Sequence, residues 1–406
     1  MKIKAFEALR PATDKVEEVA SVPYDTINSS EARSLANNKP YSFLHVIRPE
    51  IDLNPEIDIH ADEVYAKAAE NFKKFQEDGA LIREDTPCLY LYRQKMGNHI
   101  QRGIVGCCHV EDYDNNLILK HEKTRQDKED DRTRHVKTLR ANAGPIFLTY
   151  RDTAKIDKLV AEVENTAPLY DIVSEDGVGH TVWKIADSDN IVAAFESVPC
   201  TYIADGHHRS AAAARTAREM ATGNPNHNGS EEYNWFMTVL FPATQLKILP
   251  YNRAVHNLNG LNKDDFISSV KQKFTVTENG QSEPDGACQV SMYLDGKWYT
   301  LSWNKPNTDD PVAALDVSYL QDNLLAPVLG IDDPRTSTSI DFVGGIRGTQ
   351  ALTDAVDSGK CAVAFSMYPV SVDQMMDIAD AGKIMPPKST WFEPKLRSGL
   401  LVHTLD

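Results

Sequence analysis

The stretch Tyr202-Ile203-Ala204-Asp205-Gly206-His207-His208-Arg209 lies between an apolar run and an alanine-rich run. Residues 198–204 predict a short buried strand, and residues 210–220 predict a helix. The polar residues between them therefore form a strand–turn–helix junction. At such a junction the first N–H groups of the helix lack partners, and the positive end of the helix dipole attracts anions.

Two interpretations fit this junction. In the first, the polar residues only cap a helix at the surface. In the second, the turn binds an anion, and a phosphate above all. One carboxylate, two imidazoles and one guanidinium around a single glycine exceed what capping requires, which favours the anion site. Because neighbouring residues of a regular helix diverge, we expect one of His207 and His208 to face the ligand and the other to face the core or the backbone.

Composition limits the classes of protein that the chain can represent. The 406 residues are 41% hydrophobic and 25% charged, which is typical of a globular protein with two or three domains. A net charge of −16 repels nucleic acid. The six cysteines lack metal-ligand spacing, so a structural zinc site is not expected. Since no signal core or membrane-length apolar run occurs, the sequence predicts a cytoplasmic protein with reduced thiols and no membrane partner.

The other patterns predict strands and helices that interleave irregularly. Strands are expected at 89–92, 102–109, 146–150, 235–241, 289–303 (a pair around Asp295-Gly296) and 362–367. Helices are expected at 61–80, 154–165, 262–273, 317–329, 351–358 and 372–381. The irregular order and the hairpins predict an α+β fold rather than a doubly wound sheet. We expect a domain at residues 1–245 that carries the turn, and a C-terminal α+β domain at residues 246–406.

A second dense cluster of charge runs from Lys120 to His135. It fits a solvated helix with the pairs Asp130–Arg134 and Asp131–His135. It also fits a site, because the apolar pair Ile118-Leu119 precedes His121 and Glu122 like the end of a strand, where functional residues are commonly mounted. In that case Glu122 is the candidate general base, and Arg132, Arg134 and His135 are candidates to clamp a phosphate.

A third cluster lies near the end of the chain, in the run Met385–Lys395, where Lys388-Ser389-Thr390 follow two prolines. It fits either a docked tail loop or a phosphate contact made by one ammonium and two hydroxyls. It lacks the glycine-rich loop of a Walker A motif. The run Ser21-Val22-Pro23-Tyr24-Asp25 and the pair Gly344-Gly345 are weaker signals, which simple turns also explain. The sequence contains no dinucleotide fingerprint, nucleophile elbow or zinc-protease helix.

With these motifs in hand, the chain resembles a bacterial family catalogued as domain of unknown function 1015, whose members are often labelled ParB-like. The resemblance extends over the whole length. It rests on residues 21–25, 42–46, 120–122, 130–135, 204–209, 385–395 and 398–400.

The Asp-Gly-His-His-Arg turn also resembles the phosphate-binding turn of the ParB/sulfiredoxin superfamily, which includes kinases of free serine. This resemblance implies a mixed-sheet core with large insertions. It places Asp205 and His208 in the active site and leaves the role of base toward the serine hydroxyl to Glu122. It implies ATP or ADP/AMP as the nucleotide, with Mg²⁺ as the expected ion. Phosphate and nucleotide contacts are expected from Gly206, His207, Arg209, Arg132, Arg134, His135, Lys388, Ser389 and Thr390, and substrate contacts from Tyr24, Asp25 and His121.

The leading hypothesis is phosphoryl transfer between a nucleotide and serine or a similar small metabolite. The reaction in reverse would remove the phosphate of phosphoserine, as serine biosynthesis requires. The alternative is a ParB-like nucleotide-binding regulatory or partition protein, against which the net charge of −16 argues. A sulfiredoxin-type redox role would need a cysteine in the turn, and none is there. The nucleotide, the direction of the reaction, protein ligands to a metal and the oligomeric state, a homodimer included, stay open.

Overall fold

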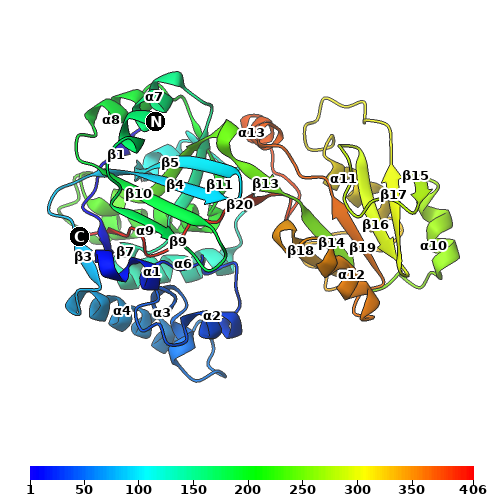
Figure 1. Cartoon of the computed structure of the whole chain (residues 1–406), viewed down its shortest axis with the longest axis horizontal. Coiled ribbons are helices and arrows are strands. Elements are labelled where there is room, and N and C mark those ends of the chain that lie inside the picture. Colours follow the sequence, from blue (N-terminus) through cyan, green and yellow to red (C-terminus); the bar gives the residue numbers. More distant parts are fainter. The chain divides into compact units, whose positions relative to one another are not determined.

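The computed structural model describes residues 1–406. The chain packs as two units, each of which is described by itself (Figure 1). The first unit consists of Met1–Leu246 and Pro394–Asp406, and the second consists of Lys247–Glu393. The predicted domains at 1–245 and 246–406 stay a prediction, as do the roles assigned to them.

The first unit is built on a nine-stranded mixed sheet. Along the sheet the order is β6-β11-β8-β12-β5-β4-β10-β9, and β1 pairs with β5. Two neighbouring pairs, β6–β11 and β8–β12, are parallel, whereas the others are antiparallel. The strands are β1 (Ile3–Lys4), β4 (Leu89–Met96), β5 (His99–His109), β6 (Ile118–Leu119), β8 (Ile146–Tyr150), β9 (Tyr170–Val173), β10 (Gly179–Ile185), β11 (Thr201–Asp205) and β12 (Trp235–Pro242). This mixed pairing confirms the α+β class.

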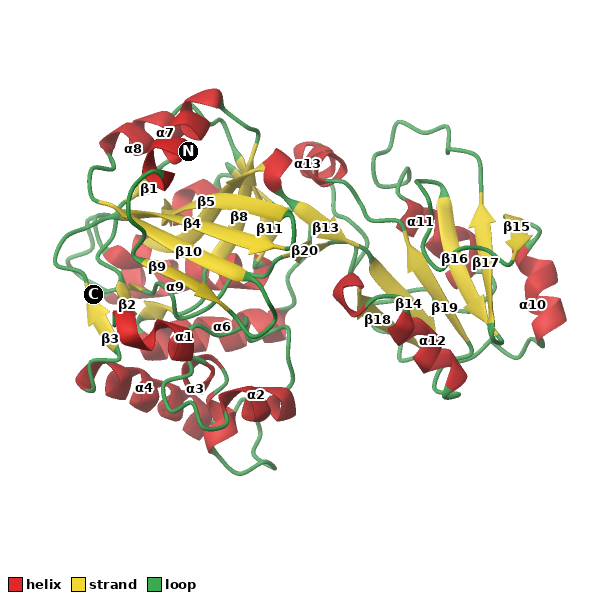
Figure 2. Cartoon of the chain, viewed as in Figure 1, coloured by secondary structure: helices red, strands yellow, loops and turns green.

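Helices cover the sheet of the first unit. They are α1 (Val16–Val19), α2 (Ser29–Ala36), α3 (Leu44–Ile47), α4 (Asp62–Glu77), α5 (Val110–Asp114), α6 (Gln126–Leu139), α7 (Ala154–Glu164), α8 (Asp189–Phe195) and α9 (His207–Gly223). One core cluster joins α7, α8 and α9 to the sheet, through Ile156, Ala194 and Ala213 among others. A second cluster joins α2, α3 and α4, which lie on the side of this unit away from α7 and α8 (Figure 2). Two small ladders complete the unit: β2 (Leu9–Pro11) with β3 (Leu81–Arg83), and β7 (Ala141–Asn142) with β21 (His403–Thr404).

The junction at Gly206 forms as the sequence predicts, with shifted bounds. Residues 201–204 are buried in β11, which pairs with β6 and β8. The strand begins at Thr201 rather than at residue 198, because Pro199 has no N–H to give to a ladder. Gly206 has a φ of +99°, a conformation that glycine adopts without strain. The helix therefore begins at His207 instead of Ser210, so the polar residues form its first turn.

The second unit is also α+β. Its six-stranded antiparallel sheet has the order β15-β17-β16-β19-β14-β18. The strands are β14 (Tyr251–Val255), β15 (Thr275–Glu278), β16 (Gln289–Leu294), β17 (Lys297–Ser302), β18 (Ile340–Gly344) and β19 (Val363–Met367), and β13 (Lys247–Leu249) pairs with β20 (Trp391–Glu393) apart from them. The helices are α10 (Lys263–Val270), α11 (Asp316–Leu320), α12 (Gln350–Asp357) and α13 (Val372–Asp380).

Most predicted elements are confirmed within a few residues at each end. The helix expected at 317–329 is wrong in part, since α11 ends at Leu320 and a π-helical turn follows at Gln321–Leu325. The N–H of Ala326 bonds to the carbonyl of Gln321, five residues back, which widens the helix there. None of the helices combines the length and the apolar composition that crossing a membrane requires.

Candidate functional site

Asp205 ends β11 as a charged carboxylate held by two cations. Nζ of Lys395 donates to its Oδ2 at 3.0 Å, and Nη2 of Arg209 lies 3.6 Å from its Oδ1. Burial raises the pKa of Asp205, but Lys395 and Arg209 overcome this and hold it well below its ordinary value. A carboxylate of such low basicity is a poor proton acceptor. Asp205 is therefore better suited to orient cations or a metal ion than to act as the general base.

Arg209 folds back over the turn. A methyl group on Gly206 would lie 3.1 Å from Nε of Arg209, so glycine also leaves room for the guanidinium. Nη1 donates to the carbonyl oxygen of Pro145, and Nη2 lies 3.8 Å from Asp25. Nε is buried and has no hydrogen-bond partner. A buried donor without a partner is costly, and an anion placed over the turn would satisfy it.

The two adjacent histidines face different surroundings, as expected from their spacing. His207 is buried, and its ring meets that of His121 edge to face, with 4.5 Å between the ring centroids. Its Nδ1 lies 4.0 Å from Oε2 of Glu122, and its Nε2 is buried without a partner. Burial lowers the pKa of His207 well below the ordinary value, so the ring is neutral at pH 7.

His208 contacts the loop before α6 rather than the core. Its Nε2 accepts a hydrogen bond from the backbone N–H of Arg125 at 3.0 Å, and burial lowers its pKa. The ring is therefore neutral, with its proton on Nδ1. This contact brings the loop that carries His121 and Glu122 beside the first turn of α9. The role of His208 in catalysis stays a prediction.

The charged run from Lys120 to His135 divides into a loop and α6, and the predicted pair Asp130–Arg134 is wrong. Asp130 pairs with Arg215 of α9, and Arg134 pairs with Asp62 of α4. Asp131 binds Arg132, with 2.7 Å between Oδ2 and Nη2. Asp130 and Arg134 have partners on other helices because α6 packs between α4 and α9. Since Arg134 is engaged at the surface by Asp62, the structure does not place it beside the turn.

Arg132, His135 and Tyr24 line one small cavity together with Arg209. The cavity measures about 40 Å³. Burial and the nearby Asp25 raise the pKa of Tyr24 to about 12, and the guanidinium of Arg132 lies 4.1 Å from the centre of its ring. Burial lowers the pKa of His135 to about 4, so its Nε2 donates to the carbonyl of Val46 as part of a neutral ring. Tyr24, Arg132 and His135 therefore share a cavity with Arg209, which belongs to the turn.

The cluster at residues 388–390 lies in the second unit. Nζ of Lys388 lies 5.3 Å from the ring of Tyr251, and Oγ of Ser389 donates to the carbonyl oxygen of Pro386 at 2.6 Å. These contacts explain the local shape of the loop. A phosphate role for Lys388, Ser389 and Thr390 stays a prediction.

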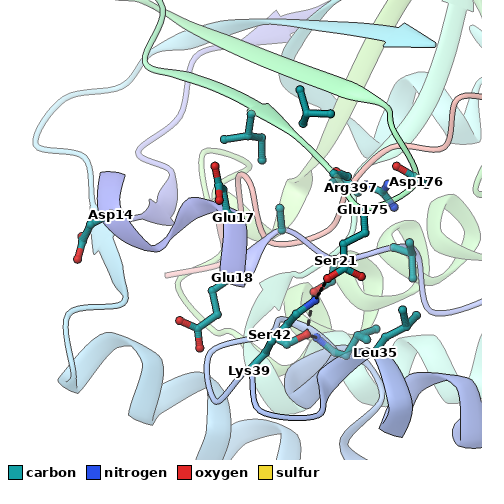
Figure 3. A pocket seen from close by; sticks show the side chains of 16 residues that line it. Asp14, Glu17, Glu18, Ser21, Leu35, Lys39, Ser42, Glu175, Asp176 and Arg397 are labelled. Atoms are coloured by element: carbon teal, nitrogen blue, oxygen red, sulfur yellow. Dashed lines mark hydrogen bonds and ion pairs between the residues drawn. The ribbon is translucent and has the colours of Figure 1, made fainter. Parts of the chain in front are cut away.

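A further cavity of about 470 Å³ lies in the first unit (Figure 3). Ser21 and Ser42 line it and are joined by a hydrogen bond of 3.2 Å between their hydroxyls. Its two cations are already engaged, since Arg397 pairs with Asp176, and Lys39 pairs with Glu175 at 2.6 Å. None of the predicted phosphate contacts lines this cavity.

One group of residues in the second unit has the donor types of a metal site. His256, Asp341 and Cys361 have ligand atoms that lie within 4.8 Å of one another. The carboxylate of Asp341 is already bound by Nζ of Lys360 at 2.7 Å. The carboxylate of Asp341 is the only oxygen ligand of the group. Because Lys360 already neutralises it, the arrangement fits an ion-paired surface better than a metal centre.

Comparison with known proteins shows the family. The chain belongs to the family described as "Protein of unknown function (DUF1015)", which it matches over residues 3–318. The match confirms the family resemblance, although the last part of the chain, with Lys388 and Lys395, lies outside the matched range. The ParB/sulfiredoxin superfamily stays a prediction.

No curated protein matches the sequence. Among solved structures, a free serine kinase in complex with AMP is 10% identical with a TM-score of 0.36, over 70% of this chain and 86% of that one. A conserved hypothetical protein from Pyrococcus furiosus is 13% identical with a TM-score of 0.36, over 72% and 92%. SbnI with a C-terminal truncation, from Staphylococcus aureus, is 11% identical with a TM-score of 0.39, over 71% and 82%. At these TM-scores the likeness does not establish the fold or the function of this chain.

Lys395 is the residue of the site that the sequence reasoning missed. It ends the stretch 385–395 that carries the family resemblance, but no role was predicted for it. Its contact with Asp205 joins residues 190 positions apart, so no local pattern could have found it.

Proposed function

We propose that this protein transfers a phosphoryl group between a nucleotide and the hydroxyl of a small metabolite, serine or phosphoserine being the favoured pair. The proposal rests above all on Arg209, whose buried Nε has no partner and lies over the glycine turn at the start of α9. Phosphoryl transfer needs positioning and neutralisation of charge more than covalent chemistry. The turn supplies both, through backbone N–H groups and a fixed guanidinium.

The residues around the turn also fit Mg²⁺. This ion prefers one or two carboxylates together with phosphate oxygens. Asp205 and Asp25 both approach Nη2 of Arg209, at 3.6 and 3.8 Å, so two carboxylates converge where phosphate oxygens would lie. A bound Mg²⁺ would neutralise the charge of those oxygens. Glu122, whose side chain is 44% exposed, is the better candidate for the general base because Asp205 is held ionised by its cations.

The direct test follows phosphate by ³¹P NMR. The protein is incubated with Mg²⁺ and either serine plus ATP or phosphoserine plus ADP or AMP. We expect phosphate to pass between the pools in at least one direction. Arg209→Ala should lower the rate at least ~100-fold, as removal of one preorganised donor does in other enzymes. Arg218→Ala is the matched control, since Arg218 is an exposed arginine of the same helix, paired with Asp114.

Asp205→Ala should also lower the rate by orders of magnitude while the far-ultraviolet circular dichroism is unchanged. Wild-type turnover by either the Arg209 or the Asp205 variant would overturn the assignment. Tight nucleotide binding without transfer to any hydroxyl compound would favour the ParB-like regulatory alternative. A gel shift at physiological salt would then test nucleic-acid binding, which the net charge of −16 disfavours.

A further inference from the structure

Two buried ion pairs line a second small cavity, next to the one that reaches Arg209. The cavity measures about 50 Å³ and shares Tyr24, Ile47, Arg132 and His135 with its neighbour. One pair joins Arg48 to Glu50, with 3.1 Å between Nε and Oε1, and the other joins Arg132 to Asp131. The side chains of Glu50 and Asp131 are only 6% and 10% exposed.

Buried ion pairs of this kind are weak sources of stability, because the cost of removing two charges from water offsets their attraction. Two such pairs on one cavity therefore call for another explanation. Each pair also keeps hydrogen-bonding capacity in reserve. Nε of Arg48 is buried and has no hydrogen-bond partner, although it lies 3.1 Å from Oε1 of Glu50. Oε2 of Glu50, Nη1 of Arg48 and Nη1 of Arg132 also make no hydrogen bond. The other contacts run from Nη2 of Arg48 to Oγ of Ser29, from that hydroxyl to Oε1 of Glu50, and from Nε of Arg132 to Oδ2 of Asp131.

The size of the cavity limits what it can bind. A water molecule needs about 10–15 Å³ measured in the same way, so 50 Å³ holds a group of roughly four or five heavy atoms. A nucleotide is far too large. The ammonium, α-carbon and carboxylate of an amino acid are of the right size. Their two opposite charges also match a wall that offers a carboxylate oxygen and two guanidinium donors.

We propose that Glu50, Arg48 and Arg132 form the subsite that binds the ammonium and carboxylate groups of a small amino acid. The ammonium is received by Glu50, and the carboxylate is received by the arginines, whose planar donors suit it. The side chain of the amino acid then extends past Tyr24 toward the cavity that Arg209 lines. The inference rests on the proposed function, because it assigns the acceptor of that reaction.

Isothermal titration calorimetry without nucleotide tests the subsite apart from the reaction. The probes are L-serine, ethanolamine (which lacks the carboxylate), glycerate (which lacks the ammonium) and inorganic phosphate. We expect L-serine to bind at least tenfold more tightly than each of the other three. If any of them binds as tightly as serine, the amino-acid subsite is wrong.

Two variants locate the binding. Glu50→Gln should raise the dissociation constant of serine at least tenfold. Arg48→Lys should raise it as well, but should leave that of ethanolamine unchanged, because ethanolamine has no carboxylate to lose. Glu56→Gln, at an exposed position of the following loop, is the matched control and should bind like the wild type. If Glu50→Gln does not fold, as judged by its melting curve, Arg48→Lys decides the question.

The outcomes separate this inference from the proposed function. Serine binding that both variants weaken, in a protein that transfers no phosphate, would support the subsite and overturn the function. Phosphate transfer to serine that neither variant impairs would support the function and overturn the subsite.

Discussion

Replacing Lys395 with methionine removes the cation closest to Asp205 while keeping most of the side-chain volume. The two charged atoms lie 3.0 Å apart, and the side chains are 16% and 27% exposed. With an effective dielectric constant of about 20, Coulomb attraction at this distance is about 5 kcal/mol before desolvation is considered. Truncating one partner of such a pair usually costs about 2 kcal/mol or more. We therefore expect Lys395→Met to lower the free energy of unfolding by about 2 kcal/mol at pH 7.

Differential scanning fluorimetry at several pH values measures this effect. For a unit of this size, a loss of about 2 kcal/mol lowers the Tm by about 4–8 °C. The pKa of Asp205 is held below its ordinary value, so the stability that it contributes is complete above the unfolded pKa of about 3.9. That stability is lost as the pH falls through the lower folded value. The difference between wild type and variant should therefore shrink below about pH 4.

Lys137→Met is the matched control. Nζ of Lys137 lies 2.6 Å from Glu219, but these side chains are 45% and 36% exposed, and such surface pairs contribute less than about 1 kcal/mol. An unchanged Tm in Lys395→Met would refute the reasoning. So would an equal loss in the control, because burial would then not distinguish the two pairs.

Three other predictions concern backbone strain, histidine charge and thiol access. Gly206→Ala should destabilise the protein by about 1–2 kcal/mol in urea unfolding, because Gly206 has a φ of +99°. The control Gly223→Ala should not destabilise it, because Gly223 has open space around it. Equal effects of the two substitutions would contradict this prediction. Burial lowers the pKa of His121 to about 4. The free energy of unfolding should therefore decrease as the pH falls below about 6.5, the pKa of histidine in the unfolded chain, and by about 2 kcal/mol at pH 5. His121→Gln should remove that loss. Of six cysteines, only Cys200 and Cys288 are partly exposed, so a thiol reagent should modify two at most in the native protein and six after unfolding; a third fast thiol would count against this.

The strand–turn–helix at the centre of the site could be predicted because its causes are local. An apolar run, a single glycine and an alanine-rich run lie within about twenty residues, and each acts on its own part of the backbone. The predicted bounds were shifted because the first turn of α9 consists of His207, His208 and Arg209, whose polar character resembles that of a loop.

The partners of the charged residues could not be predicted in the same way. Spacing along α6 suggested that Asp130 pairs with Arg134, but Asp130 pairs with Arg215 and Arg134 with Asp62. A pair at i,i+4 contributes only a few tenths of a kcal/mol, so packing against another helix easily replaces it. Lys395 reaches Asp205 for the same reason, since contacts between distant segments depend on the tertiary fold.

The first unit is discontinuous in sequence, which affects the order in which it is completed during synthesis. Lys395 and strand β21 belong to Pro394–Asp406, which follows the whole of the second unit along the chain. At about 5–20 residues per second, the ribosome needs roughly 7–30 s to proceed from the end of Met1–Leu246 to this segment. During that interval the nascent chain holds the glycine turn with Arg209 but without Lys395, the nearer of the two cations beside Asp205. A factor that binds unfinished chains would therefore meet a turn with one positive charge fewer than the complete unit has, until Pro394–Asp406 emerges.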